Sequence, residues 1–242
     1  MLLFSYITNK GSRHINEDSV GCFSNGANRC FVVCDGLGGH GMGDVASQVV
    51  VDVFESQFKQ TSNMADFMPN AFEAAQSILL SEQAERNAKM KMKTTCVALA
   101  TDEKNAYIGH VGDSRLYVFN KNKVKYRTLD HSIPQMLVLS KEIKESEIRN
   151  HPERNYVLRV MGIDWEDPMY EISPSIKLKK CQAFLLCTDG FWELILEEDM
   201  CRLLAESDSC EEWLEKMAEI VKKNGEGKNM DNYSAIAVRN VK

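Results

Sequence analysis

The 242-residue chain has no long apolar run. No apolar stretch in it approaches the roughly 20 residues that a membrane-spanning helix requires, so the sequence predicts no contact with a membrane. The segment from Met1 to Tyr6 has no basic start, no extended apolar region and no cleavage site. These absences argue against a signal peptide at this end.

The sequence also lacks paired cysteines of the metal-binding kind. None of its eight cysteines forms a Cys-x-x-Cys pair, which argues against a structural zinc site. Most lie inside apolar runs, as in residues 30–34, where cysteine behaves as a small buried hydrophobe. Free thiols without an export signal indicate the cytoplasm.

Basic residues are not in excess either. The 29 lysines and arginines are outnumbered by 35 acidic residues, which gives a net charge of -6. A nucleic-acid partner is therefore not expected, since phosphate backbones call for clustered cations. The content of 44% apolar and 26% charged residues is ordinary for a globular protein. A monomer is the simplest expectation.

The pattern of apolar residues predicts strands mixed with a few long helices. We expect helices over about 44–58 and 66–90, with Pro69 in the first turn of the second. Four short strands should form an antiparallel meander, followed by a polar stretch with short helices and then by three further strands. The order indicates an α+β fold with two packed sheets and helices outside. The expected strands of the meander are 96–100, 106–111, 115–119 and 124–128.

Four aspartates stand at the ends of strands that look buried. Asp35 and Asp189 each precede glycine after an apolar run, Asp113 follows another strand, and Asp231 precedes the last one. Singly, each such aspartate is more often a turn residue than a ligand. Together they suggest a site for hard divalent cations, which prefer carboxylate oxygens and offset the repulsion between them.

The N-terminal segment 11–18 adds further candidates. Glu17 and Asp18 supply two more acids, and Arg13 offers a planar fork suited to bidentate phosphate binding. Alone, this segment would be read as a solvated polar loop. Two metal ions about 4 Å apart can activate water for in-line attack at phosphorus.

With these motifs in order, the chain resembles the metal-dependent protein phosphatases of type 2C, in their compact bacterial form. The resemblance runs over nearly the whole chain and implies a four-layer α-β-β-α sandwich in a single catalytic domain, residues 1–242. The matching segments are Gly-Ser-Arg-His-Ile-Asn-Glu-Asp (11–18), Val-Cys-Asp-Gly-Leu-Gly-Gly-His (33–40), Lys-Thr-Thr (93–95), Gly-His-Val-Gly-Asp-Ser-Arg (109–115), Asp-His-Ser (130–132), Leu-Arg-Val-Met-Gly (158–162), Cys-Thr-Asp-Gly (187–190) and Asp-Asn-Tyr-Ser (231–234).

The resemblance implies a serine/threonine protein phosphatase with two Mn²⁺ or Mg²⁺ ions. Asp35 would bridge the ions, one ion would also take the Gly36 carbonyl, and the other would take Asp189 and Asp231. A metal-activated hydroxide would attack phosphorus in line, without a phosphoenzyme. Substrates would be phosphoproteins, and a serine/threonine kinase in the same cell is the expected counterpart.

Other positions receive supporting roles from the same resemblance. Glu17 would act through metal-bound water, with Asp18 nearby, and Asp113 would hold a weaker third ion. Arg13 would clamp the substrate phosphate. Residues 132–159 would form a flap beside the site that influences substrate choice.

One departure concerns the proton donor to the leaving group. Many eukaryotic members have histidine directly after Asp-Gly, where this chain has Leu37. His40 is close in sequence and is one candidate, with metal-bound water the favoured alternative. We interpret His131 as structural, at the base of the flap.

Two other functions compete with this interpretation. Residues 36–41 match the dinucleotide fingerprint Gly-x-Gly-x-x-Gly after a strand and before a helix. Asp35 would place negative charge near the pyrophosphate, and a second helix follows where a parallel strand belongs. The other competitor is a degenerate phosphatase that only binds phosphoproteins, which should have lost metal ligands that this chain retains.

Overall fold

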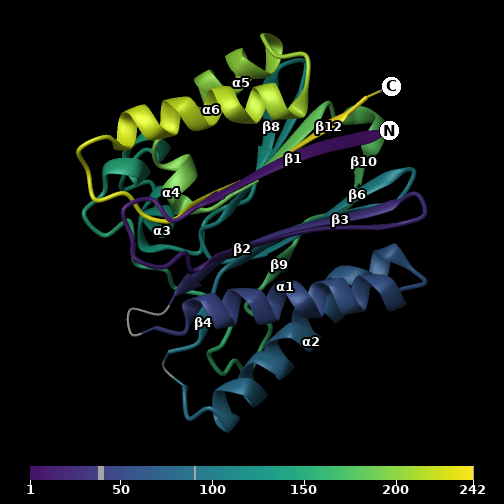
Figure 1. The fold of residues 1–242 in the computed structure, drawn as a ribbon, viewed down its shortest axis with the longest axis vertical. Helices are drawn as coiled ribbons and strands as arrows, with labels where there is room; N and C mark the ends of the chain where they lie inside the picture. Colours follow the sequence, from purple (N-terminus) through teal and green to yellow (C-terminus); the bar gives the residue numbers. More distant parts are fainter. Residues whose placement is uncertain (38–40, 90, 242) are drawn as a thin grey trace.

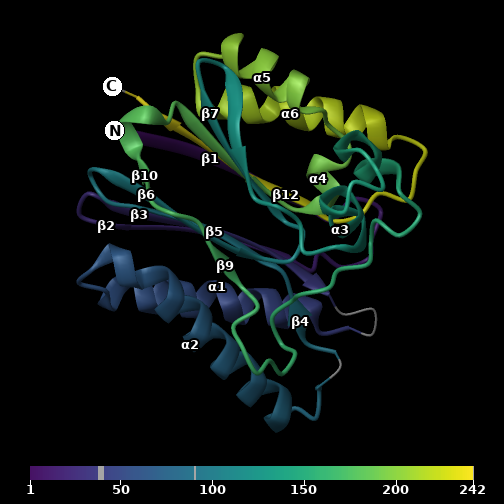
Figure 2. The same ribbon diagram turned by 180° about the vertical axis from the view of Figure 1, so that it is seen from behind.

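The computed structural model describes residues 1–37, 41–89 and 91–241. Two antiparallel sheets pack face to face, and helices cover the outer face of each. Figure 1 shows the four layers edge-on, with both chain termini at one end of the sandwich. Figure 2 shows the same layers from behind. The expected α+β sandwich is confirmed.

One sheet has five strands in the order β1-β12-β11-β7-β8. Its central strand β11 is buried along its whole length, because the second sheet covers one face and helices cover the other. The strands are β1 (Leu2–Asn9), β12 (Tyr233–Asn240), β11 (Ala183–Cys187), β7 (Arg115–Asn120) and β8 (Lys123–Arg127).

The other sheet has seven strands. Five follow the order β10-β6-β5-β3-β2, while β4 pairs with the end of β3 and β9 pairs with β6. The strands are β10 (Ile176–Lys177), β6 (Asn105–Val111), β5 (Cys96–Thr101), β3 (Asn28–Leu37), β2 (Asp18–Asn25), β4 (Lys93–Thr94) and β9 (Glu171–Ile172).

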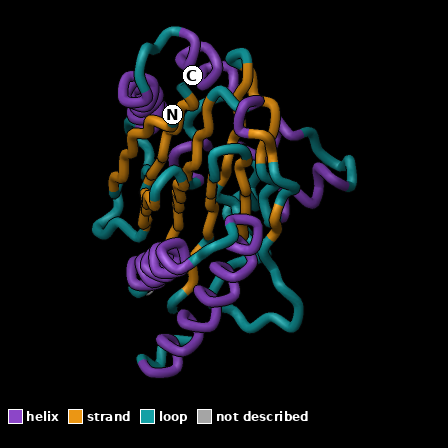
Figure 3. Tube along the Cα trace, turned by 90° about the vertical axis from the view of Figure 1, so that its right-hand side faces the viewer, coloured by secondary structure: helices purple, strands orange, loops and turns teal. Residues whose placement is uncertain are grey.

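Helices α1 (Gly43–Gln60) and α2 (Met64–Glu85) cover the seven-stranded sheet, and α5 (Glu197–Ala205) and α6 (Cys210–Gly225) cover the other. Figure 3 shows both helical layers outside the strands. The Ser209 hydroxyl accepts from the Glu212 N–H at 3.0 Å and caps α6. Among the described helices, none combines the length and apolar character of a membrane span.

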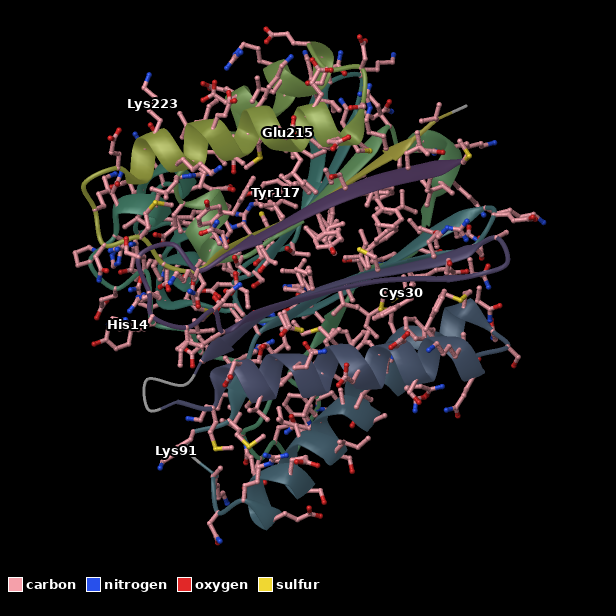
Figure 4. The ribbon with its side chains drawn as sticks, in the orientation of Figure 1. His14, Cys30, Lys91, Tyr117, Glu215 and Lys223 are labelled. Atoms are coloured by element: carbon pink, nitrogen blue, oxygen red, sulfur yellow. The ribbon has the colours of Figure 1, made fainter. Side chains whose placement is uncertain are left out.

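Three hydrophobic cores separate the four layers. The core between the sheets contains Phe31, Phe184 and Ile236, all fully buried. A second core lies between the seven-stranded sheet and α1 and α2, and a third lies beneath α5 and α6 around Trp213. Figure 4 shows Cys30 on the α1 side of its sheet, consistent with the expected role as a small buried hydrophobe.

Two details of the sequence interpretation are wrong. Helix α2 begins at Met64, two residues earlier than expected, so Pro69 lies in its second turn rather than its first. The four central strands do not form one meander. Strands β5 and β6 pair in one sheet and β7 and β8 in the other, so residues 112–114 cross between the sheets. Local pattern detects each hairpin, whereas the sheet it joins is decided by packing.

The segment expected to form the flap contains two short helices, α3 (Ile133–Leu139) and the 3-10 helix η1 (Glu145–Asn150). An isolated bridge between Ser132 and Val157 closes its base. The His131 N–H donates to the Gly112 carbonyl at 2.9 Å. The base is thus held against the crossing segment between the two sheets.

A buried ion pair fixes this base to the five-stranded sheet. Two Arg115 nitrogens donate to the two Asp130 oxygens at 2.8 and 2.6 Å, and both side chains are 2% exposed or less. The Arg115 guanidinium carbon also lies 3.3 Å from the centre of the Trp192 ring. Arg127 adds a third contact to Asp130 at 3.1 Å.

We expect Asp130→Ala to lower the free energy of unfolding by about 3–5 kcal/mol, because it leaves the buried Arg115 guanidinium with only the more distant Glu197 carboxylate, at 3.9 Å, as counter-charge. Glu55→Ala is the control, since it removes an exposed ion pair with Lys59 and should cost less than about 1 kcal/mol. Urea unfolding of both variants measures the difference. Equal losses would contradict the buried-pair interpretation.

Candidate metal and phosphate site

The predicted site residues, with one exception, meet in one pocket of about 920 Å³. Its lining includes His14, which Figure 4 labels at the end of the sandwich opposite the termini. Asp18 is the exception, because it is 7% exposed and does not line the pocket. A second pocket of about 860 Å³ near the termini contains none of these residues. The predicted residues that line the first pocket are Arg13, Glu17, Asp35, Gly36, Asp113, Asp189 and Asp231.

Asp35 is held by its backbone. Its N–H donates to the Thr95 hydroxyl at 3.0 Å, and its carbonyl accepts from the Thr95 N–H at 2.9 Å and the Thr94 hydroxyl at 2.8 Å. The Lys-Thr-Thr segment therefore fixes the strand end that carries the carboxylate. A Cβ on Gly36 would lie 2.5 Å from the Glu17 carbonyl, so only glycine allows this close approach.

Asn232 fixes the N-terminal loop against the last strand. Its Oδ1 accepts from the Glu17 N–H at 2.8 Å, and its Nδ2 donates to the carbonyls of Lys10 and Ile15 at 2.9 and 3.0 Å. Sequence reasoning gave this asparagine no role, although it directly follows Asp231. The loop between Lys10 and Glu17 is therefore not the free polar loop that its composition alone indicates.

Thr188, which directly precedes Asp189, connects this part of the site to Asp18. Its hydroxyl donates to Asp18 Oδ2 at 3.1 Å and accepts from the Ser234 N–H at 3.0 Å. Asp189 then opens the short helix α4 (Asp189–Trp192). This threonine is a second supporting residue to which sequence reasoning gave no role.

Asp113 lies in the segment that crosses between the sheets. The Trp192 indole donates to the Asp113 carbonyl at 3.0 Å, and the adjacent Ser114 hydroxyl lies 2.7 Å from the Thr95 hydroxyl. The Arg115 guanidinium stacks on the same Trp192 ring. Asp113 is therefore tied both to the strand end at Asp35 and to the base of the flap segment.

The carboxyl groups are electrostatically strained. Burial and, after it, the charges of neighbouring acids together raise the pKa of Asp18 and the pKa of Asp189 to about 7. Burial, together with the charge of Asp189, also raises the pKa values of Asp35 and Asp113 well above the usual range. Such a set is ionised at neutral pH only beside positive charge.

A pair of hard divalent cations fits this donor set. Asp18 Oδ1 and Asp113 Oδ1 are buried and have no hydrogen-bond partner among the described residues. Buried polar atoms normally have partners, and carboxylate oxygens are preferred ligands of Mg²⁺ and Mn²⁺. The unpartnered oxygen of Asp113 and the clustered carboxylates around it therefore suit metal binding.

Arg13 contacts the acidic cluster directly. Its Nε and Nη2 donate to the two Asp231 oxygens at 2.9 and 2.8 Å. Both side chains are nearly half exposed, at 48% and 44%, so the fork is accessible from the pocket. The Asp231 hydrogen bonds raise the pKa of Arg13, which keeps its positive charge fixed beside the carboxylates.

His110 and His131 do not line the pocket that contains these ligands, whereas His14 does. His110 and His131 form a group with Glu171 whose ligand atoms lie within 4.8 Å of one another. Their rings are stacked, with planes 21° apart, so their in-plane lone pairs run side by side instead of converging on one ion. His131 Nδ1 also accepts from the Gly112 N–H at 3.2 Å. His40 lies outside the described residues.

The structure gives the dinucleotide alternative no support. Strand β3 pairs with antiparallel neighbours on both sides, whereas the fingerprint belongs to a parallel βαβ unit. Helix α1 leads into α2 rather than back to a parallel strand. The described part of the glycine-rich segment therefore connects a strand and a helix in a different architecture.

Comparison with known proteins agrees with this geometry. The family model described as "Protein phosphatase 2C" matches residues 9–233. The serine/threonine phosphatase stp of Listeria welshimeri is 31% identical over 93% of this chain and 90% of its own length. The serine/threonine protein phosphatase PstP of Mycobacterium tuberculosis is 28% identical over 78% of this chain, which corresponds to 36% of that larger protein.

Solved structures show the same fold. The crystal structure of serine/threonine phosphatase Stp1 from Staphylococcus aureus has a TM-score of 0.90 and 30% identity, covering 100% of this chain and 96% of that one. The catalytic domain of PstP, solved in complex with two manganese ions, has a TM-score of 0.83 at 22% identity. It covers 100% of this chain and 99% of its own. The chain belongs to the protein phosphatase 2C family.

Proposed function

We propose that this chain is a metal-dependent phosphatase that hydrolyses phosphoserine and phosphothreonine side chains of other proteins. The gathering of buried carboxylates beside an accessible arginine in one pocket carries this proposal. Membership of the protein phosphatase 2C family supports the same function. The retained acids also argue against a degenerate module that only binds phosphoproteins.

The proposed cofactor is a pair of Mn²⁺ or Mg²⁺ ions. Asp35 would hold both ions, with the Gly36 carbonyl on one side and Asp189 and Asp231 on the other. When bound, the ions activate water for attack at phosphorus and neutralise developing charge. The close approach of Glu17 to Gly36 and Gly43 suits a position beside this pair.

Two further acids would act around this pair. Glu17 would act through water, while Asp18, buried and bonded to Thr188, would add negative charge behind the ligands. Asp113 would hold a weaker third ion together with Asp189.

The protein's own groups bind and orient the phosphate. The Arg13 fork can donate two parallel hydrogen bonds to phosphate oxygens, since a carboxylate and a phosphate present similar oxygen pairs. Asp231 holds this fork at the pocket edge before substrate arrives. The rigid strand ends at Asp35 and Asp189 keep the acidic side fixed, so little reorganisation is required.

The proposed function extends to the domain organisation, the substrates and the location of the enzyme. Residues 1–242 would form a single catalytic domain, with a flap over about 132–159 that influences substrate choice. The substrates would be phosphoproteins made by a serine/threonine kinase, and the enzyme would act as a cytoplasmic monomer without a nucleic-acid partner. The flap segment contributes Asn155 and Val157 to the pocket lining, which supports a role in substrate contact.

We expect Asp189→Ala to reduce p-nitrophenyl phosphate turnover by more than about 100-fold, because even an outer partner of a metal ligand contributes 10–100-fold. Mn²⁺ should raise the melting temperature of the wild-type protein but not that of the variant. Asp164→Ala, at an exposed ion pair with Lys89, is the control. Wild-type turnover in Asp189→Ala would contradict the assignment.

We expect Arg13→Ala to raise KM about 10- to 100-fold with a smaller change in kcat, since charge-assisted hydrogen bonds contribute about 1.5–3 kcal/mol. Arg13→Lys should recover only part of this loss, because an ammonium lacks the planar fork. Steady-state kinetics with a phosphothreonine peptide measure both. An unchanged KM in Arg13→Ala would remove Arg13 from phosphate binding.

We expect Asp113→Asn to lower turnover while the two tighter ions remain bound. The substitution removes a negative charge but keeps the size of the buried side chain. Calorimetric titration with Mn²⁺ counts the tight sites, and kinetics at rising Mn²⁺ report the weaker one. Loss of a tight site would show that Asp113 belongs to the main pair instead.

A further inference from the structure

Only two of the described residues that line the catalytic pocket carry a full positive charge, Arg13 and Lys93. The charge of Arg13 is matched by Asp231 at 2.8 Å. For Lys93, no described carboxylate lies within ion-pair distance of the ammonium, in contrast to the paired Lys59 and Lys89 on the helical side of the molecule.

Lys93 is held on a fixed element next to the metal-binding strand. It is the first residue of β4, which pairs antiparallel with the end of β3 so that Lys93 faces Leu37 and Thr94 faces Gly36. On its other side, Thr94 forms a bridge with Met161. The strand therefore lies between the Asp35 strand end and the segment that leaves the flap.

The pairing fixes the direction of the Lys93 side chain. Directly paired residues of neighbouring strands project to the same face of a sheet, and both Lys93 and Leu37 line the pocket. Lys93 is half-buried, as expected when an aliphatic stem packs along an apolar neighbour and leaves its ammonium in a polar space.

A positively charged side chain in this pocket would favour the binding of a phosphate substrate. Five acidic side chains line it, namely Glu17, Asp35, Asp113, Asp189 and Asp231. A phosphate monoester brings about two further negative charges. Cations positioned around a phosphoryl group stabilise it in the ground state and in the transition state. A positive group that is not already paired with a carboxylate can therefore attract this anion alongside Arg13.

We propose that Lys93 is a second substrate-contacting cation, which binds the phosphoryl group of the substrate from the β4 side of the pocket while Arg13 binds it from the Asp231 side. This inference rests on the proposed phosphatase function. It assigns Lys93 a place beside Leu37, a residue of the pocket lining whose own side chain is apolar.

The test compares Lys93→Met, Lys93→Arg and the control Lys91→Met in the Mn²⁺-loaded full chain. Lys91 is exposed and does not line the pocket, and Figure 4 shows it projecting on the far side of the α1 layer. We expect Lys93→Met to raise KM for p-nitrophenyl phosphate and for a phosphothreonine peptide about tenfold, with kcat changed less than about threefold. The KM of Lys93→Arg should stay within about threefold of the wild-type value, and the KM of Lys91→Met should equal the wild-type value.

A second readout does not depend on turnover. Calorimetric binding of inorganic phosphate to the Mn²⁺-loaded protein should weaken about tenfold in Lys93→Met but not in Lys91→Met. Unchanged phosphate affinity and KM in Lys93→Met, with a wild-type melting temperature, would overturn the inference. Equal weakening in Lys91→Met would also overturn it, because general surface charge would then explain the effect. Absent wild-type turnover would count against the proposed function alone, since phosphate binding still tests Lys93.

Discussion

Repulsion among buried carboxylates is the constraint on which this structure depends. Asp18, Asp35, Asp113 and Asp189 come from four separate segments and meet where burial and mutual charge raise their pKa values. Folding alone gives no reason to gather them, because isolated buried charges are strongly destabilising. A site for divalent cations gives that reason, and it explains why the cluster lies at the rim of the sandwich, within reach of solvent and substrate.

Much of the surrounding structure keeps these carboxylates in place. Thr94 and Thr95 bind the backbone at Asp35, Asn232 binds the N-terminal loop, and Thr188 joins Asp18 to the last strand. The partners of these groups are mostly backbone atoms, which cannot change rotamer. The acidic side chains are therefore held by strand ends and not by flexible loops, as electrostatic preorganisation requires.

The flap segment is joined to the same framework. Arg115 binds Asp130 at its base and stacks on Trp192, whose indole donates to the Asp113 carbonyl. One buried cation thus connects the base of the flap segment to an acid of the pocket within two contacts. Lys93 and Val160 line the same pocket, next to the bridge between Thr94 of β4 and Met161. Substrate contact and metal binding therefore depend on shared backbone elements.

The sequence by itself determined the element types, the α+β class and the acids, because strand ends, helical periodicity and Asp-Gly dipeptides are local features. It also identified Arg13 through the ordered motifs around it. Only the tertiary structure decided that the two central hairpins join different sheets, that Arg13 pairs with Asp231, and that Asn232 and Thr188 fix the site. The contacts of Arg13, Asn232 and Thr188 join residues that are 46 to 222 positions apart. Local sequence patterns do not predict contacts between residues so far apart in the sequence, because these contacts arise from how the two sheets pack across a common core.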